Sequence, residues 1–535
     1  MIERLLINAN IRTLDPAHPR ATALALYRER IVAVGDDSLR DLAGPDTAID
    51  DLEGRTVLPG LTDAHIHWSW TARGMQDVDL FNTSDRAEAV RRVGARAEVT
   101  PPGQWITGQG WAQADWPDRA FPTAADLDAV TPNNPVYLSA RSGHAAWVNS
   151  AALRLAGITA ATPDPSGGAI QRDAAGAPTG VLLEDPAMML VHHLVPVPSP
   201  EQLADWMLVA QEQAWQVGLT GLHDFDDPDC MAALQVMRER GQLGLRVVKH
   251  INRDWVAHAH ALGLRAGFGD DWIRIGALKL FADGALGPRT GLMFAPYEGE
   301  PENTGIAVTD KEEMAELVLR ATAAGLPSAI HAIGDKAVHD VLDVFALARQ
   351  EEARLGIARP ARRHRIEHVQ IIHPDDIPRL AELSVVASMQ PIHATSDYPM
   401  ADRYWGRRAR WSYNWRVQIE AGAMLAFGSD SPVETFDPRQ GVYAALTRRR
   451  ADGSPGPDGW YPEGRLVLDE ALRAYTFGPA YAAGLEDRLG RLAPGYLADL
   501  IVLDRDWYTV PPEEILQTAV VGTMVGGAWK RRAFG

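Results

Sequence analysis

The sequence predicts an α/β fold: a (β/α)8 TIM barrel with a large insertion after its first strand, plus a small β-sandwich domain built from both chain termini. Two observations predict it. Both ends of the chain contain short β-segments without a helical period, and the region between them alternates apolar strand-like runs with helix-like segments. Strands that alternate with helices indicate parallel βαβ units, and eight such units indicate a barrel.

The two termini are expected to form one composite domain from residues 1–58 and 480–535. The N-terminal segments LLINANIRTLD, ATALALYRERIVAVG and TAIDDLEGRTVLPG each end in residues that favour turns. The C-terminal segments GRLAPGYLADLIVLDRD and TAVVGTMVGGAWKRR have the same character. Two strand-rich ends around a long middle region predict a single β-domain.

The barrel is expected to occupy residues 59–479. Its eight strand-like runs are VLPGLTDAHIH (57–67), GLTGLHDFD (218–226), LRVVKHIN (245–252), IRIGALKLFADG (273–284), LPSAIHAIGD (326–335), RHRIEHVQII (363–372), LSVVASMQPIH (383–393) and AMLAFGSDSP (423–432). Segments between them, such as KEEMAELVLRATAAG, carry apolar residues at helical spacing. From about 75 to 205 the chain passes through Pro-, Gly- and Trp-rich segments and short helices, which we interpret as an insertion after strand one.

Composition and charge exclude several classes of function. The 535 residues are 46% hydrophobic, and the formal charge of −18 argues against binding to a phosphate backbone, so no nucleic-acid partner is expected. The only cysteine, Cys230, excludes an internal disulfide and fits a reducing cytoplasm. No apolar stretch approaches the ~20 residues of a membrane span. We expect a cytoplasmic enzyme without a membrane partner, and a homodimer as the common default.

His65 and His67 lie one residue apart at the end of the first strand-like run. Residues two apart on a β-strand share a face, so the two imidazoles would project side by side. Such a pair is half of a transition-metal site. Taken alone, it is equally compatible with two strand-end histidines that bond to the backbone.

Further polar residues stand at the carboxyl ends of later strands, where barrel enzymes place their chemistry. They are Lys279 and Asp283 on strand four, His331 on strand five, His368 on strand six and Asp430 on strand eight. Four histidines, a lysine and an aspartate at one rim are hard to explain by packing. The pattern therefore predicts a metal centre.

Lys279 lies inside an apolar run, where an unpaired ammonium would be costly to bury. Reaction with carbon dioxide would convert it to an anionic carbamate whose two oxygens could bridge two metal ions. An ion pair with Asp283 or Glu184, or an ammonium that reaches the rim, explains it equally well. Asp430 likewise has two explanations, as a metal ligand that also carries a proton or as the N-cap of the following helix.

Six motifs in this order resemble the amidohydrolase superfamily, in particular amidohydrolase family 3, the large-insertion branch with the YtcJ-like proteins and N-substituted formamide deformylases. They are VLPGLTDAHIH, LKLFADGALGPRTG, AIHAIGDKAVHDVL, RHRIEHVQII, LAFGSDSPVE and GRLAPGYLADLIVLD. GQGWAQADW and PVYLSARSGHAAWVNSAAL also match, so the resemblance covers nearly the whole chain. One departure is SGHAAWVNS, where relatives carry an acidic residue before Gly-His, and it bears on substrate contacts in the insertion.

The resemblance implies two divalent metal ions, most often zinc in this family. It makes His65 and His67 ligands of one ion and His331 and His368 ligands of the other. Lys279, as a carbamate, would bridge the two ions, and Asp430 would be both ligand and proton shuttle. All six positions are filled in this sequence.

The implied function is hydrolysis of a C–N bond, amide or formamide, in a small hydrophobic or aromatic molecule. A hydroxide that bridges the metals would attack, and Asp430 would pass its proton to the departing amine. One alternative is a mononuclear deaminase-type hydrolase, a class that usually lacks the lysine. The other is a non-catalytic metal-binding barrel.

Four more residues are candidates for contact with the substrate. They are His393 at the end of strand seven, Arg289 after strand four, and Trp111 and His144 in the insertion. Asp224 and Glu367 are candidates for orienting the histidine ligands, because metal sites usually need such partners.

Overall fold

The computed structural model describes residues 2–534, which divide into two compact units. Unit 1 contains the chain up to Trp70 and from Leu208 onward, and unit 2 runs from Thr71 to Met207. Two helices contain the boundaries between them: α1 (Trp68–Gly74) and α6 (Pro200–Gln216).

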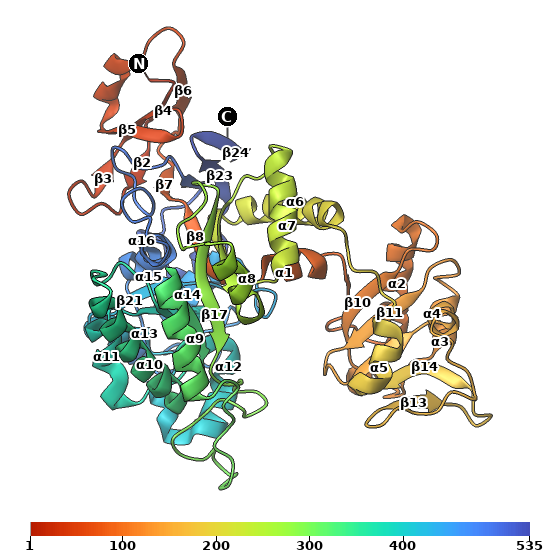
Figure 1. Cartoon of the computed structure of the whole chain (residues 1–535). Helices are drawn as coiled ribbons and strands as arrows, with labels where there is room; N and C mark the ends of the chain where they lie inside the picture. Colours follow the sequence, from red (N-terminus) through yellow and green to blue (C-terminus); the bar gives the residue numbers. More distant parts are fainter. Residues whose placement is uncertain (1, 535) are drawn as a thin grey trace. The chain divides into compact units, whose positions relative to one another are not determined.

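Eight parallel strands form the central sheet of unit 1, and each pairs with the next along the chain (Figure 1). Their bounds are β8 (Leu61–Ile66), β15 (Leu219–Asp224), β16 (Arg246–Asn252), β17 (Ile273–Phe281), β18 (Ser328–Ala332), β19 (Arg365–His368), β20 (Val386–Met389) and β21 (Met424–Phe427). Every strand lies inside one of the eight predicted runs. The prediction of a TIM-like barrel is therefore confirmed.

Two backbone hydrogen bonds join the first strand to the segment after the last. The His67 amide donates to the Ser431 carbonyl at 2.9 Å, and the Asp430 amide donates to the His65 carbonyl at 2.7 Å. Gly428 permits this approach, because a Cβ there would lie 2.7 Å from Asp63 Oδ1 and closer still to the His65 amide.

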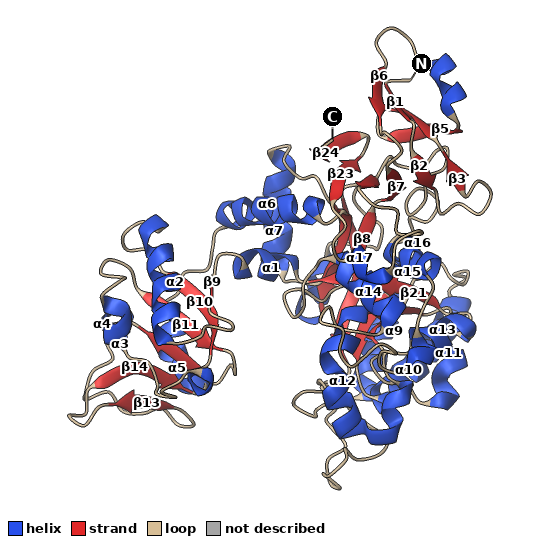
Figure 2. Ribbon diagram, turned by 180° about the vertical axis from the view of Figure 1, so that it is seen from behind, coloured by secondary structure: helices blue, strands red, loops and turns tan. Residues whose placement is uncertain are grey.

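Helices surround the barrel strands (Figure 2). They are α7 (Pro228–Glu239), α8 (Val256–Ala261), α9 (Lys311–Ala324), α10 (Asp335–Arg354), α11 (Ile377–Glu382), α12 (Pro391–Trp405), α13 (Trp415–Glu420), α14 (Pro438–Thr447), α15 (Leu468–Tyr475) and α16 (Phe477–Ala482). α9 shows why such segments are helical: the Asp310 side chain caps its first turn, and Gly325, with φ 92°, ends it. No helix among residues 2–534 has the length and apolarity that crossing a membrane requires.

The termini of unit 1 contribute two further sheets. One has the order β5-β4-β1-β6, and the other has the order β24-β23-β22-β7-β2-β3, which combines strands from both chain ends. The N-terminal strands are β1 (Arg4–Ile7), β2 (Asn10–Arg12), β3 (Arg20–Ala21), β4 (Ala23–Tyr27), β5 (Arg30–Gly35), β6 (Ala48–Asp51) and β7 (Thr56–Pro59); the C-terminal ones are β22 (Leu500–Leu503), β23 (Val520–Val525) and β24 (Ala528–Arg532), with the short α17 (Pro512–Ile515) between β22 and β23. Leu24 of the first sheet and Val57 and Leu500 of the second belong to one buried apolar cluster.

Unit 2 contains a six-stranded sheet of order β13-β14-β12-β11-β10-β9, which the sequence did not predict. Its elements are β9 (Val78–Asp79), α2 (Arg86–Val99), β10 (Ile106–Trp111), α3 (Ala124–Asp128), β11 (Val136–Ala140), β12 (Ala145–Val148), α4 (Ser150–Leu155), β13 (Ala169–Arg172), β14 (Pro178–Leu183) and α5 (Asp185–His192). The Pro- and Gly-rich segments that suggested irregular structure connect these short strands. Unit 2 has apolar clusters of its own, around Trp111 and around Ile170.

Candidate metal centre

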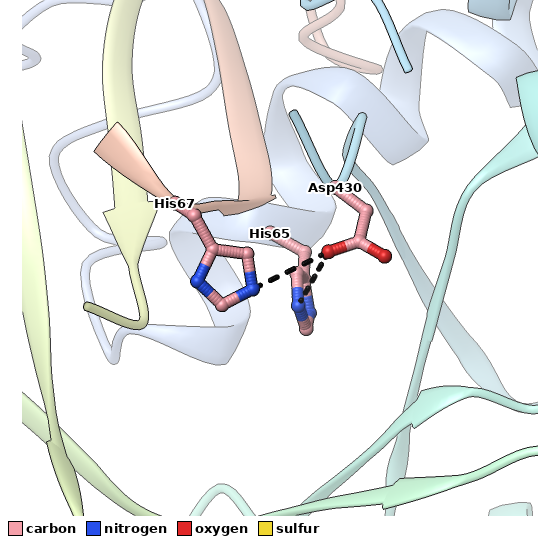
Figure 3. Close-up of side chains that lie close together, drawn as sticks. All are labelled: His65, His67 and Asp430. Carbon is pink, nitrogen blue, oxygen red and sulfur yellow. Dashed lines mark ion pairs between the residues drawn. The ribbon is translucent and has the colours of Figure 1, made fainter. Parts of the chain in front are cut away.

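His65 and His67 stand at the carboxyl end of β8, and a carboxylate holds one ring nitrogen of each. His65 Nδ1 donates to Glu367 Oε2 at 2.6 Å, and His67 Nδ1 donates to Asp226 Oδ1 at 3.0 Å. Their Nε2 atoms lie 3.4 and 3.5 Å from the same Asp430 oxygen (Figure 3). Each of these three residues therefore has one potential ligand atom within 4.8 Å of the corresponding atoms of the other two.

Asp430 follows β21 with φ 61°, a left-handed conformation that is uncommon for aspartate. Burial disfavours its charge, but the nearby imidazoles of His65 and His67 prevail and hold its pKa well below the usual value. The next helix, α14, is capped by Asp437 rather than by Asp430. The structure therefore leaves the Asp430 carboxylate at the rim as an anion beside two imidazoles.

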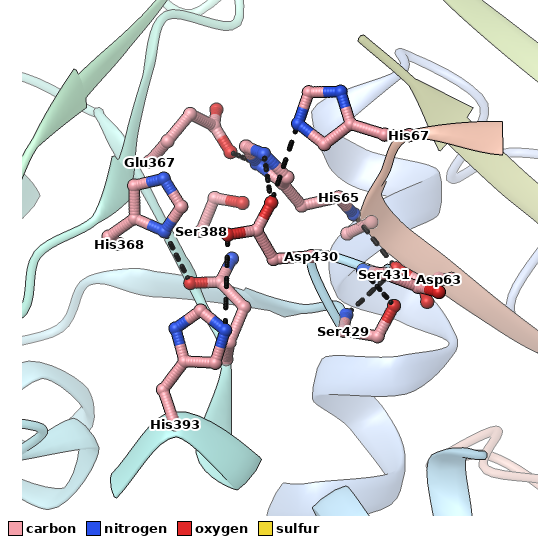
Figure 4. Close-up of polar contacts among 12 residues, drawn as sticks. Asp63, His65, His67, Glu367, His368, Ser388, His393, Ser429, Asp430 and Ser431 are labelled. Carbon is pink, nitrogen blue, oxygen red and sulfur yellow. Dashed lines mark hydrogen bonds and ion pairs between the residues drawn. The ribbon is translucent and has the colours of Figure 1, made fainter. Parts of the chain in front are cut away.

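His368 ends β19 with φ 76°, and its Nδ1 donates to Gln390 Oε1 at 2.8 Å. His393 lies in the first turn of α12, and its buried Nε2 has no hydrogen bond and lies 3.9 Å from Asp430 Oδ2 (Figure 4). His368, His393 and Asp430 form a second set of ligand atoms within 4.8 Å of one another. His393, predicted as a substrate contact, thus stands at the rim itself.

His331 on β18 faces the same region, with its ring centroid 4.6 Å from that of His368. Its Nε2 donates to the Gly284 carbonyl at 2.8 Å, which leaves Nδ1 free. Burial and the nearby Lys279 ammonium lower the pKa of His331 to about 3, so the ring is neutral. Neither of the two compact ligand sets includes His331.

Lys279 is buried in β17, and its Nζ lies 4.6 Å from the ring centres of Phe225 and Phe281. Burial lowers the pKa of its ammonium to about 8, although Glu367 and Asp430 favour the charge. The ion pair with Asp283 that could have explained the lysine does not form. Asp283 instead accepts three backbone N–H groups.

These residues fit a pair of divalent cations. In each of the four predicted histidine ligands a fixed partner holds one nitrogen, which is how metal-binding imidazoles are oriented. The second nitrogen of His65 and of His67 faces the Asp430 carboxylate. Burial opposes protonation of His67, yet Asp226 and Asp430 raise its pKa to about 9. The two carboxylates that favour a proton on His67 would also favour a metal cation at this place.

A cavity of about 750 Å³ opens over this cluster. Seven polar residues of the barrel line it: His65, His67, Lys279, His331, His368, His393 and Asp430. Apolar side chains form much of the remaining wall: Trp70, Phe281, Leu286, Ile333, Met400 and Val433. The Trp70 ring stacks on His67 at 4.8 Å between centroids.

The other predicted substrate contacts have different environments. The Arg289 guanidinium is paired with Glu300 at 2.6 Å, beside the loop 285–288 that lines the cavity. Trp111 is fully buried in unit 2, and its indole N–H donates to the Leu138 carbonyl, which favours packing over contact with substrate. His144 is exposed and bonds to Glu184 at 2.9 Å, also within unit 2.

Sequence reasoning identified Glu367 as a partner for a histidine but missed two others. Asp224 does not bond to a histidine; it pairs with Lys249 at 2.9 Å and accepts the Trp68 amide. The partner of His67 is Asp226, two residues further on, and the partner of His368 is Gln390. Each follows the end of a barrel strand, which is the signal that could have found both.

An eight-stranded barrel with histidines and an aspartate around a cavity at its carboxyl rim has the architecture of a metal-dependent hydrolase. Comparison with known proteins gives the same class. The model of the amidohydrolase family Amidohydro_3 matches residues 48–529. A crystal structure of an uncharacterised metal-dependent hydrolase from Pyrococcus furiosus is 30% identical, with a TM-score of 0.78, over 94% of this chain and 99% of that one.

Two curated relatives match along nearly their full length. The putative amidohydrolase YtcJ of Bacillus subtilis is 32% identical over 94% of this chain and 95% of its own. The N-substituted formamide deformylase of Arthrobacter pascens is 31% identical over 98% of both chains. The chain therefore belongs to the amidohydrolase family, as its motifs predicted.

Proposed function

We propose that this chain is a two-metal amidohydrolase that cleaves the C–N bond of an amide or formamide in a small apolar molecule. The observation that carries the proposal is the convergence of five histidines, a lysine and an aspartate on one cavity of about 750 Å³. These side chains come from positions as far apart in sequence as His65 and Asp430.

In this proposal His65 and His67 would hold one zinc-class ion and His331 and His368 the other, with Asp430 as a further ligand. Lys279 would supply oxygen ligands as a carbamate. The carbamate forms when the neutral amine bonds to the carbon of carbon dioxide and releases a proton. The low pKa of Lys279, about 8, supports it because it makes the neutral amine accessible. When bound, the ions supply a hydroxide near neutral pH and polarise the substrate carbonyl.

Asp430 is proposed to move the proton. Its carboxylate is charged before reaction because its pKa is held well below the usual value, so it can accept a proton from the attacking water. The same oxygen atoms can then deliver that proton to the nitrogen that departs. His393, whose Nε2 has no hydrogen bond and lies 3.9 Å from Asp430 Oδ2, is proposed to contact the substrate.

The cavity wall supports an apolar or aromatic substrate. Trp70, Phe281 and Val433 are 51%, 45% and 68% exposed, so each offers apolar surface to a bound molecule. The name of the Arthrobacter relative specifies N-substituted formamides, and an N-substituent is the part of such a molecule that this wall would receive. We propose further that unit 2 is an insertion in the barrel domain and that the terminal sheets form a β-sandwich.

A mononuclear deaminase-type hydrolase is the second candidate. His65, His67 and Asp430 form a complete three-residue set, which would suffice for one ion. Lys279 has no part in such a site. The number of metal ions per chain separates the two candidates.

The test is a panel of N-formyl and N-acyl amines with aliphatic and aromatic substituents, assayed with metal-replete protein. We expect release of the amine, fastest with bulky apolar substituents. The variant Asp430→Asn should lower kcat by about 10²–10⁴-fold. Asp452→Asn, in an exposed loop, is the control and should leave kcat unchanged. A metal-replete protein inert to the whole panel would contradict the proposal.

A further inference from the structure

A second cavity lies at the opposite end of the barrel from the metal centre. It has a volume of about 200 Å³. Parts of β16, the first half of β17, residues just before β17, β18 and β19, and the end of α16 line it. Because the strands are parallel, their amino ends meet at one edge, away from Asp430 and His368. Five basic or imidazole side chains line it: His250, Arg274, Arg362, Arg363 and Arg365.

Three nitrogen atoms of these residues are buried without a hydrogen bond in the described chain: His250 Nε2, Arg362 Nε and Arg363 Nη1. The tautomer of His250 follows from its other nitrogen. Nδ1 accepts the Ala277 amide at 2.9 Å, and burial holds the pKa of the ring well below its usual value. The proton of the neutral ring is therefore on Nε2. All three atoms are N–H donors, and a buried donor without an acceptor is costly.

Two of the guanidinium charges at this cavity also lack an ion pair. Arg363 pairs with Glu486 and Arg365 pairs with Glu367, but neither Arg274 nor Arg362 has an ion-pair partner within 4 Å among residues 2–534. The nearest acids are already engaged. Asp271 and Asp487 pair with Arg488, and Glu352 pairs with Arg349. Burial lowers the pKa of both unpaired arginines, which is the effect of a cation without a counterion.

We propose that this cavity is a binding site for a small oxyanion of the phosphate class, either inorganic phosphate or the phosphoryl group of a small phosphomonoester. Guanidinium groups present paired N–H donors that match phosphate oxygens, and an anion would satisfy the donors and the charges together. Water would satisfy the donors alone. The volume of about 200 Å³ suits a small anion better than a drug-sized ligand, which needs about 300 Å³ or more.

The site is separate from the metal centre. Between the two lies Phe225, whose ring stacks on His65 on one side and on His250 on the other, each at 4.1 Å between centroids. An anion beside His250 would thus lie beneath this stack and leave the catalytic cavity open. The proposal does not depend on the reaction at the rim.

The test is calorimetric titration of the metal-replete chain with inorganic phosphate and, in parallel, with glycerol 3-phosphate. We expect Arg274→Gln and Arg362→Gln each to weaken binding about tenfold or more, since each removes hydrogen bonds to a charged group. Arg265→Gln is the matched control, because Arg265 is an exposed neighbour that acts on Arg362 through charge but does not line the cavity. It should weaken binding by less than about twofold. Tighter binding of the ester than of phosphate would identify the phosphoryl group of a metabolite as the ligand, and the reverse would identify free phosphate.

Phosphate can also bind divalent metals, so the variants decide where it binds. Affinity that both arginine variants retain and that disappears when metal is removed would overturn the proposal. A crystal structure of the wild-type protein grown with phosphate provides a second test, which does not depend on the stability of the variants. Tetrahedral density between Arg274 and Arg362 is the expected result, and water alone at that position would overturn it.

Discussion

Single carboxylates orient the residues of the metal centre. Glu367 is fully buried and shares its oxygens between Arg365, at 2.5 Å, and His65, at 2.6 Å. Burial would raise its pKa, but these two partners hold that pKa well below the usual value. Glu367 therefore remains an anion that fixes the ring of His65. Asp226 fixes the ring of His67 in the same way.

Asp226→Asn tests this role. An amide accepts a weaker hydrogen bond than a carboxylate and adds no negative charge, so His67 should be held less firmly. We expect the affinity for zinc to fall about 10–100-fold, measured by competition with a chromophoric chelator. Asp227→Asn, at the adjacent exposed position, should leave that affinity unchanged. Equal affinities in both variants would show that Asp226 does not position a ligand.

The pKa of Lys279 predicts how the enzyme assembles with pH. Only the neutral amine reacts with carbon dioxide, and with a pKa of about 8 the neutral fraction rises from about one tenth at pH 7 to about half at pH 8. Metal-free protein supplied with zinc under a fixed pressure of carbon dioxide should therefore regain activity several-fold faster at pH 8 than at pH 7. Reactivation that is independent of carbon dioxide would contradict a carbamate.

The sequence identified the residues of the rim but not all of their partners. His65, Lys279 and Asp430 could be recognised because a strand places them at a known end of a barrel. Asp226 and Gln390 also follow strand ends, but their pairing with His67 and His368, 159 and 22 residues away, is recorded by no local pattern. The unpaired N–H donors around His250 could not be predicted either, because they come from separate segments that only the folded barrel brings together.

At the scale of elements, the junction between β8 and β21 determines where the candidate ligands stand. The hydrogen bond from the Asp430 amide to the His65 carbonyl connects two of these candidates through the backbone itself. A side chain at Gly428 would displace this junction, because its Cβ would overlap the His65 backbone.

Gly428→Ala should therefore destabilise the fold by about 1–3 kcal/mol, as overpacking of a core does, and should also weaken metal binding. Urea unfolding and zinc competition measure the two effects. Gly44→Ala is the control, since its Cβ would meet only Thr47 Oγ1, at 4.0 Å. A Gly428→Ala protein with unchanged stability and zinc affinity would show that the junction tolerates displacement.

The barrel strands were predictable for a physical reason. A parallel strand that is buried on both faces is largely apolar, and the β21 sequence MLAF shows this. In unit 2, β10 and β14 contain Gly or Pro, so the same test did not detect them. Their pairing depends on segments as distant as β10 and β14, which lie in one sheet.

At the scale of the whole molecule, the candidate metal centre lies entirely within one of the two units. All candidate metal ligands and the whole cavity around them belong to unit 1. Unit 2 has apolar clusters of its own and none of the predicted ligands. Damage to the core of unit 2 should therefore leave the metal centre able to bind its ions.

Trp111→Ala tests this independence. Removing a fully buried indole should destabilise unit 2 by about 3–5 kcal/mol, seen as an earlier thermal transition. The zinc content per chain should not change. Leu155→Ala, at a 60% exposed position of unit 2, should have little effect on either quantity. Loss of zinc in Trp111→Ala would show that the ligands depend on unit 2.

The most direct test of the metal centre is elemental analysis of metal-replete protein together with the variant Lys279→Met. The two-metal arrangement predicts about two zinc-class ions per wild-type chain and a clear loss of metal in the variant, because a thioether offers no oxygen to bridge them. One ion per chain in both proteins would contradict the two-metal centre and favour the mononuclear alternative, and no bound metal in either would contradict the assignment of these side chains as ligands.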